Sequence, residues 1–192
     1  GVNIMRGKKV YLAELREGDT ELLAEWQWDP QFMRGISDDV FHPFGVDDWE
    51  DMFGEPDSNE AFFFTIRQIK DDALVGFISL TGVMMKNRLA VIGIGIPHES
   101  YRGKGYGKEA VSLLLAYAFD HLGLHKVRLH VHSFNQNAIE MYRSLGFVQE
   151  GINRESVYQS GKWYDQLDFG FLQSEWRLLE ETKVSRFKHE AR

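Results

Sequence analysis

Apolar residues recur at two different spacings along the chain, and the changes of spacing predict strands and helices in alternation. Three neighbouring stretches rich in β-branched and aromatic residues, the first two joined by a polar turn, predict an antiparallel meander. These strands are expected at Ala61–Ile69, Leu74–Val83 and Arg88–Ile96. Further strands are expected at Val10–Leu15, Lys126–His132, Phe147–Glu150, Glu155–Gln159 and Trp163–Phe171.

Helical spacing of apolar residues is clearest in two stretches. Lys108–Leu122 carries a broad apolar face of the kind that packs on a sheet, and Asn135–Leu145 follows the next predicted strand. Asp19 is expected to cap an earlier helix, and Asp47–Phe53 is expected as a short helix within an otherwise irregular stretch. The charged residues after Glu175 predict a solvated helix or a frayed end.

A glycine-rich segment, Tyr101–Lys108, lies between the third meander strand and the first long helix. Glycine lets the backbone approach a ligand closely, and the start of a helix presents N–H groups and the positive end of its dipole to an anion. The segment therefore predicts a cradle for a pyrophosphate. Its spacing fits neither a Walker loop nor the Gly-x-Gly-x-x-Gly of a dinucleotide fold. Taken in isolation, these residues also fit a strand-to-helix turn that binds nothing.

Two segments resemble motifs of the GNAT superfamily of N-acetyltransferases. Arg102, Gly105 and Gly107 match its Arg/Gln-x-x-Gly-x-Gly/Ala signature. The segment Asn135–Phe147 is similar to its Asn-x-x-Ala-x-x-x-Tyr-x-x-x-Gly-Phe pattern. The order and separation of the two segments fit the family, and so does the predicted order of strands and helices.

The resemblance implies an α/β (α+β) GNAT fold, in which a mixed, mostly antiparallel central sheet with splayed strands is flanked by helices. It implies a single acetyltransferase domain over residues 1–192, with a core over about residues 8–175 and a charged tail at 176–192. Gly93 and Gly95 would suit the place where the third meander strand departs from regular pairing, although glycine in a strand also marks a plain bulge.

The resemblance also implies acetyl-CoA as the co-substrate. Its pyrophosphate would lie on the glycine-rich segment, its pantetheine arm would pair with freed backbone near Ile94 and Ile96, and Tyr142 would face the sulfur and protonate it. The residues implied to bind the cofactor are Ile94, Ile96, Arg102, Gly103, Lys104, Gly105, Tyr106, Gly107, Lys108, Asn135, Asn137, Ala138 and Tyr142. By itself, Tyr142 also fits an ordinary helical aromatic that packs against residues one turn away.

A base or a water chain is expected beside the acceptor. An alkylammonium with a pKa near 10.4 must lose a proton before its nitrogen can attack a thioester, at a cost of about 4 to 5 kcal/mol at neutral pH. His98 and Glu99 follow the strand implied to bind the cofactor, whereas His130 and His132 share one face of the next strand. The sequence singles out none of these four residues.

Composition fits a cytoplasmic enzyme. A chain of 192 residues with 43% hydrophobic and 27% charged residues can bury a full core. No apolar run approaches the roughly 18 residues of a membrane span, so no membrane association is expected. The absence of cysteine excludes disulfides and thiolate metal sites. No metal is expected, because no carboxylate completes a set with the neighbouring His121 and His125.

Charge points to a cationic acceptor. Nine acidic residues and no Lys or Arg lie from Asp38 to Glu60, in a chain of formal net charge −7. This pattern favours an amine such as a polyamine, would attract aminoglycosides and basic peptides equally well, and disfavours nucleic acid. It also fits an acidic loop that is merely solvated. The stretch Arg154–Trp176 is similar both to spermidine N-acetyltransferases and to acetyltransferases of ribosomal-protein N-termini, and it does not separate them.

Two functions remain open at the level of sequence. The first is an acetyl-CoA-dependent N-acetyltransferase that moves an acetyl group to a primary amine of a polyamine or a protein N-terminus by direct attack on the thioester. The second is a non-catalytic coenzyme A-binding or polyamine-sensing module on the same fold. The resemblance also favours a homodimer or higher homo-oligomer, and Trp163 and Tyr164 would line either its interface or the acceptor pocket.

Overall fold

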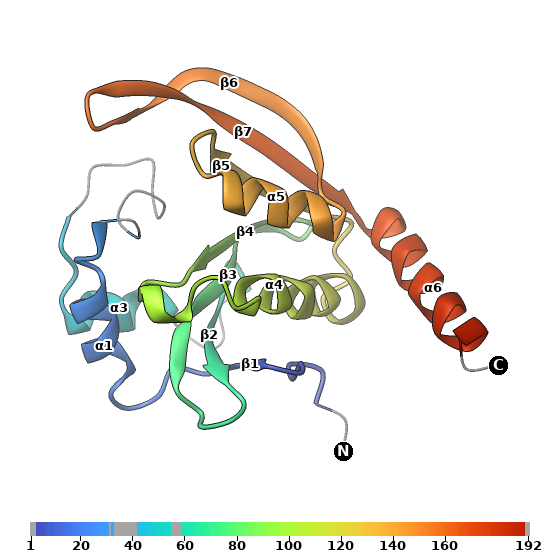
Figure 1. The fold of residues 1–192 in the computed structure, drawn as a ribbon, viewed down its shortest axis with the longest axis horizontal. Helices are drawn as coiled ribbons and strands as arrows, with labels where there is room; N and C mark the ends of the chain where they lie inside the picture. Colours follow the sequence, from blue (N-terminus) through green and yellow to red (C-terminus); the bar gives the residue numbers. More distant parts are fainter. Residues whose placement is uncertain (1–2, 31, 33–41, 55–58, 191–192) are drawn as a thin grey trace.

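A mixed sheet forms the centre of the molecule. The computed structural model describes residues 3–30, 32, 42–54 and 59–190. Within them the sheet has seven strands in the order β1-β2-β3-β4-β5-β7-β6, and only β4 and β5 are parallel neighbours (Figure 1). The strands are β1 Val10–Ala13, β2 Phe62–Gln68, β3 Leu74–Met84, β4 Leu89–Gly95, β5 Lys126–His132, β6 Val148–Gln159 and β7 Lys162–Leu172.

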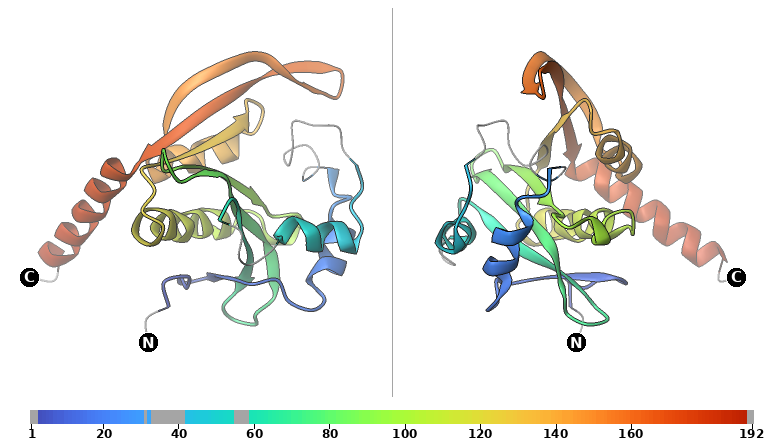
Figure 2. Two further views of the ribbon diagram at one scale, coloured as in Figure 1. Left: turned by 180° about the vertical axis from the view of Figure 1, so that it is seen from behind. Right: turned by 60° about the vertical axis from the view of Figure 1, so that its left-hand side comes forward.

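Helices lie on both faces of the sheet (Figure 2). On one face α4 and α5 pack on the main core, where Leu114 is buried with Ile78 and Ile92. On the other face α1 and α3 form a smaller core, in which the rings of Trp49 and Phe77 are 5.7 Å apart. The helices are α1 Asp19–Trp26, α3 Val46–Phe53, α4 Tyr106–Ala116, α5 Gln136–Leu145 and α6 Gln173–Glu190, with a 3-10 turn at Glu99–Tyr101 and a π turn at Tyr117–His121.

The parallel strands β4 and β5 separate after a short paired region. Leu89–Val91 pairs with Lys126–Arg128. Beyond these pairs β4 remains bonded to β3 as far as Gly95, while β5 remains bonded to β7 as far as His132. Among the described strands, none pairs with the free edge of β4 from Ile92 onward. The predicted splay between these two strands is confirmed.

The meander, the two long helices and the short helix predicted at 47–53 are also confirmed, but β6 differs from the prediction. It is one strand from Val148 to Gln159, where two strands were expected. Its pairing with β7 shifts at Gln149/Gly151 and again at Asn153/Val157, and Glu155 has a φ of 46°. The polar residues between the two predicted strands thus form a bulged part of a continuous strand.

Two helix starts also differ from the prediction. Gly105 has a φ of 81° and caps α4, so this helix begins at Tyr106, two residues earlier than expected. Gly18, not Asp19, caps α1. The Asp19 carboxylate is instead buried inside the fold, 2.8 Å from the Arg67 guanidinium.

The C-terminal tail is helical, as one of its two predicted alternatives had it. It belongs to α6, a largely exposed helix that extends away from the sheet (Figure 1). Of the stretch predicted to be irregular, residues 31, 33–41 and 55–58 lie outside the described residues.

Candidate active site

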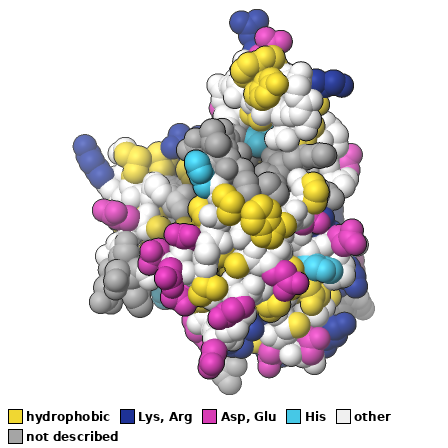
Figure 3. Space-filling model, turned by 90° about the vertical axis from the view of Figure 1, so that its left-hand side faces the viewer, with side chains coloured by type: hydrophobic (Ala, Val, Ile, Leu, Met, Phe, Trp, Pro, Cys, Tyr) yellow, Lys and Arg dark blue, Asp and Glu magenta, His cyan; other side chains and the backbone are white. Residues whose placement is uncertain are grey.

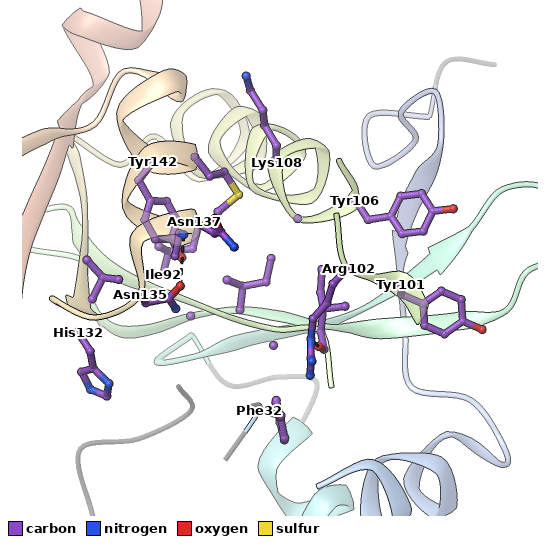
Figure 4. Close-up of a pocket in the computed structure, with 18 of the residues that line it drawn as sticks. Phe32, Ile92, Tyr101, Arg102, Tyr106, Lys108, His132, Asn135, Asn137 and Tyr142 are labelled. Atoms are coloured by element: carbon purple, nitrogen blue, oxygen red, sulfur yellow. Dashed lines mark hydrogen bonds between the residues drawn. The ribbon is translucent and has the colours of Figure 1, made fainter. Parts of the chain in front are cut away.

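A cavity of about 810 Å³ lies where β4 and β5 separate. Neighbouring side chains along a strand face opposite sides of the sheet. The lining includes Ile92 and Ile94, which pack toward α4 and α5, and also Val91, Gly93 and Gly95 from the alternate positions of β4. The cavity therefore passes through the sheet at the splay. In Figure 4, Tyr142 lies on one side of the strands and His132 and Phe32 lie on the other.

The glycine-rich segment places open backbone donors at one end of this cavity. Gly103 and Gly105 have φ values of 70° and 81°, which glycine adopts without strain, and they turn the chain into α4. The first N–H groups of a helix have no partner within it. The Glu109 side chain in the first turn is directed to another element, because its Oε1 accepts hydrogen bonds from the backbone N–H groups of Lys9 and Val10 at 2.7 and 2.9 Å. A helix start of this kind suits an anion.

Arg102 braces this loop. Its Nε donates to the Ile96 carbonyl at 3.0 Å, and one terminal nitrogen donates to the Pro97 carbonyl at 2.6 Å and to Asp29 Oδ1 at 3.0 Å. These bonds tie the start of the loop to the exit of β4 and to the segment after α1. The guanidinium therefore holds the shape of the loop.

Tyr142 projects from α5 into the opposite end of the cavity, near Asn137 (Figure 4). Only 6% of the residue is exposed, and its ring lies 5.6 Å from that of Phe147. Its hydroxyl has no hydrogen-bond partner among the described residues. Burial raises the pKa of this phenol to about 12. Tyr142 is therefore a protonated and available donor at neutral pH.

The start of α5 is fixed by a side-chain cap. Asn135 Oδ1 accepts a hydrogen bond from the Ala138 N–H at 3.3 Å. Both residues line the cavity, and the small Ala138 side chain leaves space beside the helix. The cap fixes the first turn of the helix that carries Tyr142.

The four candidate bases fall into two groups. His130 and His132 line the cavity, on the face of β5 opposite the residues that pack toward α4. His98 and Glu99 do not line it. The His98 ring packs against Trp26 at 5.7 Å, and its Nδ1 lies 2.7 Å from Ser100 Oγ. The structure thus brings two of the four residues to the cavity.

Comparison with known proteins assigns the family. The model of the acetyltransferase (GNAT) domain matches residues 9–148. This chain is a GNAT acetyltransferase. YokL of Bacillus subtilis, an uncharacterized prophage-derived N-acetyltransferase, is 30% identical over 150 residues, which are 78% of this chain and 83% of YokL. Spermidine N(1)-acetyltransferase of Vibrio cholerae is 27% identical over 165 residues, 86% of this chain and 94% of that enzyme.

Solved structures agree with this assignment. Spermidine N-acetyltransferase of Vibrio cholerae in complex with CoA and spermine superposes with a TM-score of 0.76 at 26% identity, over 87% of this chain and 97% of that one. A dodecameric structure of the same enzyme gives a TM-score of 0.72 at 25% identity, over 87% and 95% of the two chains. The GNAT fold and the N-acetyltransferase class inferred from the sequence are therefore confirmed.

The GNAT cavity gathers most of the residues predicted to bind the cofactor, and Lys104 does not line it. The Lys104 carbonyl instead accepts a hydrogen bond from Lys9 Nζ at 2.9 Å. The Tyr106 hydroxyl donates a hydrogen bond to Gln68 Oε1 at 2.6 Å. Because its side chain is engaged there, only the backbone of Tyr106 is left to contact a ligand at the start of α4. Further lining residues were not among those implied to bind the cofactor: Phe32, Val91, Ile92, Gly93, Gly95, Tyr101, Val131 and Met141. Of these, Gly93 and Gly95 were indicated as a departure from regular pairing, and Tyr101 belongs to the glycine-rich segment.

The acidic stretch of this GNAT domain is partly described. Asp47, Asp48, Glu50 and Asp51 are exposed on α3, and Glu60 is exposed before β2. Acidic side chains are numerous on the face shown in Figure 3. The acidic residues at 38, 39, 55 and 57 lie outside the described residues. The described carboxylates give the α1 and α3 side of the molecule an acidic character.

Across residues 3–30, 32, 42–54 and 59–190, no three or more His, Asp or Glu side chains are grouped so that they could hold a metal ion. In the same part of the chain, no helix combines the length and apolar character needed to cross a membrane.

Proposed function

We propose that this protein, acting as a single catalytic domain, transfers the acetyl group of acetyl-CoA to a primary amine of a cationic acceptor, a polyamine or a protein N-terminus. The observation that carries the proposal is the cavity through the sheet, with an anion cradle at one end and an unengaged tyrosine hydroxyl at the other. The cavity would hold the two substrates on opposite faces of the sheet, with the reacting atoms meeting at the splay.

The cavity fits the coenzyme in three respects. The open N–H groups at the start of α4 suit a pyrophosphate, and the free edge of β4 suits the amide groups of a pantetheine arm. Gly107 leaves a path between them, because a Cβ there would lie 3.5 Å from Ile96 Cδ1 and 3.6 Å from Met141 Sδ. When bound, acetyl-CoA supplies an activated acetyl group as a thioester.

Tyr142 is proposed to donate a hydrogen bond to the sulfur of coenzyme A. As the carbon–sulfur bond breaks, negative charge develops on sulfur, and a buried hydroxyl with no other partner is well placed to donate to it. A thiol has an ordinary pKa near 8.5, so full proton transfer from a phenol of pKa about 12 is uphill by about 5 kcal/mol. Tyr142 therefore acts chiefly through its hydrogen bond. The thiolate then gains a proton that balances one released by the acceptor nitrogen.

The acceptor is proposed to be cationic. The exposed carboxylates of α3 would attract such a molecule, and the spermidine N-acetyltransferase complex with spermine shows that a fold similar to this one can accommodate a polyamine.

Arg102→Ala is expected to weaken CoA binding about tenfold, because the loop loses its hydrogen bonds to Ile96, Pro97 and Asp29. Asp29→Asn is expected to weaken it less, since two of those bonds remain. Isothermal titration calorimetry measures both effects. Arg177→Ala is a matched control, because Arg177 makes a similar pair with Asp120 on the surface, outside the cavity. Equal CoA affinity in all three variants would contradict the bracing role.

The pH dependence of the rate follows from the raised pKa of Tyr142. A donor with a pKa of about 12 remains more than about 99% protonated at pH 9.5. The rate should therefore rise with pH as the acceptor amine becomes neutral. At pH values up to about 9.5, loss of the tyrosine proton should not lower the rate. Initial rates of CoA release from about pH 6 to about pH 9.5 measure this. A descending limb that disappears in Tyr142→Phe would contradict it.

We also infer that the protein forms a homo-oligomer. The support is the dodecameric relative and the exposed pair Tyr158 and Trp163 at the tip of the β6–β7 hairpin, whose rings are 5.2 Å apart. Light scattering of the purified protein, compared with a Trp163→Ser variant, tests this assembly.

The acceptor class is tested by coenzyme A release from acetyl-CoA against spermidine, spermine, aminoglycosides and basic peptides with free N-termini, with product masses measured. Acetylation of one class supports the proposal and names the acceptor. Tight CoA binding without turnover of any acceptor would instead favour the non-catalytic module.

A further inference from the structure

A short chain of hydrogen bonds reaches the cavity from the face opposite Tyr142. His130 of β5 stands opposite Asp168 of β7, and its Nδ1 lies 2.6 Å from Asp168 Oδ1. The other carboxylate oxygen, Oδ2, accepts a hydrogen bond from Asn153 Nδ2 at 3.1 Å. The same amide nitrogen donates to Gln166 Oε1 at 3.1 Å. Both hydrogens of the Asn153 amide are thus used, and Asp168 is held on both oxygens.

This arrangement fixes the tautomer of the imidazole. A carboxylate only accepts hydrogen bonds, so the Nδ1 of His130 must carry the hydrogen. In the neutral ring the other nitrogen, Nε2, is then an acceptor. The chain therefore has the parts of a general base and its orienting group.

The position of His130 matches the place where the acceptor must react. The last pair between β4 and β5 joins Val91 to Arg128, so His130 lies two residues into the splay. It lines the same cavity as Tyr142 but lies on the other face of the sheet. Its side chain is 46% exposed, which leaves Nε2 accessible to a solute entering from that face.

The neighbouring candidate is less suited to this task. His132 also lines the cavity, but only 8% of it is exposed and its ring packs 5.2 Å from Phe134. A base that serves a hydrophilic acceptor must be reachable from solvent, and 46% of the His130 side chain is exposed.

We propose that His130 is the base that takes the proton from the acceptor amine, with Asp168 and Asn153 as positioning residues; this rests on the acetyl transfer proposed above. The entering ammonium gives one proton to Nε2, which passes it to solvent. The nitrogen lone pair then bonds to the carbonyl carbon, and the carbon–sulfur bond breaks with its electron pair on sulfur. The nitrogen loses a second proton, and the sulfur gains one. Each turnover thus yields an amide, a thiol and one net proton.

Substitution of His130 tests the base directly. His130→Ala is expected to lower kcat about 100-fold and to leave the KM for acetyl-CoA unchanged, and added imidazole should restore part of the rate. With an acceptor whose amine is already neutral at the assay pH, the loss should shrink to a few-fold, because the first proton transfer to His130 is no longer needed. His98→Ala is the matched control, since His98 lies outside the cavity, and it should keep the parent kcat.

Substitution of Asp168 tests the orientation. Asp168→Asn places an amide opposite Nδ1, and an amide N–H there would shift the imidazole hydrogen to Nε2 and remove the acceptor. We expect kcat to fall as far as in His130→Ala, with circular dichroism and melting temperature close to those of the parent. Asn153→Ala should cause a smaller fall in kcat, since the aspartate remains.

The outcomes separate this inference from the proposed function. Parent turnover that persists undiminished in His130→Ala overturns the base while leaving acetyl transfer intact. An equal loss of kcat in His130→Ala with ionised and neutral amines also overturns the base assignment, because His130 would then have only a structural role in the site. Absence of turnover by the parent with every acceptor overturns the proposed function and this inference together.

Discussion

Tyr142→Phe is expected to lower turnover about 100-fold and to leave the Kd for CoA unchanged. The substitution removes one hydroxyl from a residue that is 6% exposed and keeps the ring that packs on Phe147. The lost interaction is a hydrogen bond to charge that develops only as the carbon–sulfur bond breaks, and loss of such a donor typically costs 10²- to 10³-fold in rate. Steady-state rates of CoA release and calorimetric titration with CoA measure the two quantities.

Tyr117→Phe is the matched control for this prediction. Burial also raises the pKa of Tyr117, but this residue lies in the π turn after α4 and does not line the cavity. It should turn over at the parent rate. Unchanged turnover in Tyr142→Phe would remove Tyr142 from the chemistry, and equal losses in both variants would indicate a general effect of the hydroxyl on stability.

Gly107→Ala is expected to weaken CoA binding at least tenfold while the protein remains as stable as the parent or becomes slightly more stable. Gly107 lies in the first turn of α4 with an ordinary helical backbone, so alanine there is not strained and helix propensity favours it. The new methyl group would sit 3.5 to 3.7 Å from Ile96, Met141 and Ile94, at ordinary contact distance. It would fill the path from the cradle to the pantetheine site and keep an anion away from the N–H groups.

The prediction is specific to the site, because CoA affinity should fall while stability stays the same or rises slightly. Most substitutions that weaken ligand binding through the fold also lower stability. Ser112→Ala on the same helix raises helix propensity outside the cavity, and it should keep the CoA affinity of the parent. Thermal unfolding and CoA titration of both variants provide the comparison. Parent-like CoA affinity in Gly107→Ala would contradict the placement of the coenzyme along α4.

The local part of the site could be predicted from the sequence because its determinants are close together in the chain. The turn from Gly103 to Gly107 and the helix that carries Tyr142 each follow from residues within one or two helical turns. Spacing and glycine content therefore identified both segments. The same reasoning predicted the meander, since alternation of apolar residues is a property of each strand.

The features that the sequence did not reveal depend on strand register. His130 and Asp168 are 38 residues apart, and only the pairing of β5 with β7 places them opposite each other. The bulged course of β6, which places Asn153 opposite Gln166, interrupts the apolar alternation, so the sequence predicts two separate strands there. Likewise, the partners of Arg102 include two backbone carbonyls, which carry no signature in the sequence.

The central claim is that one cavity through the sheet brings the thioester and the acceptor amine together at the splay. A crystal structure of the protein with CoA tests it most directly. The account predicts the pyrophosphate on the N–H groups of Gly103–Gly107, the pantetheine arm along the free edge of β4, and the sulfur within hydrogen-bonding reach of the Tyr142 hydroxyl. Coenzyme A bound elsewhere, or a sulfur directed away from Tyr142, would contradict it.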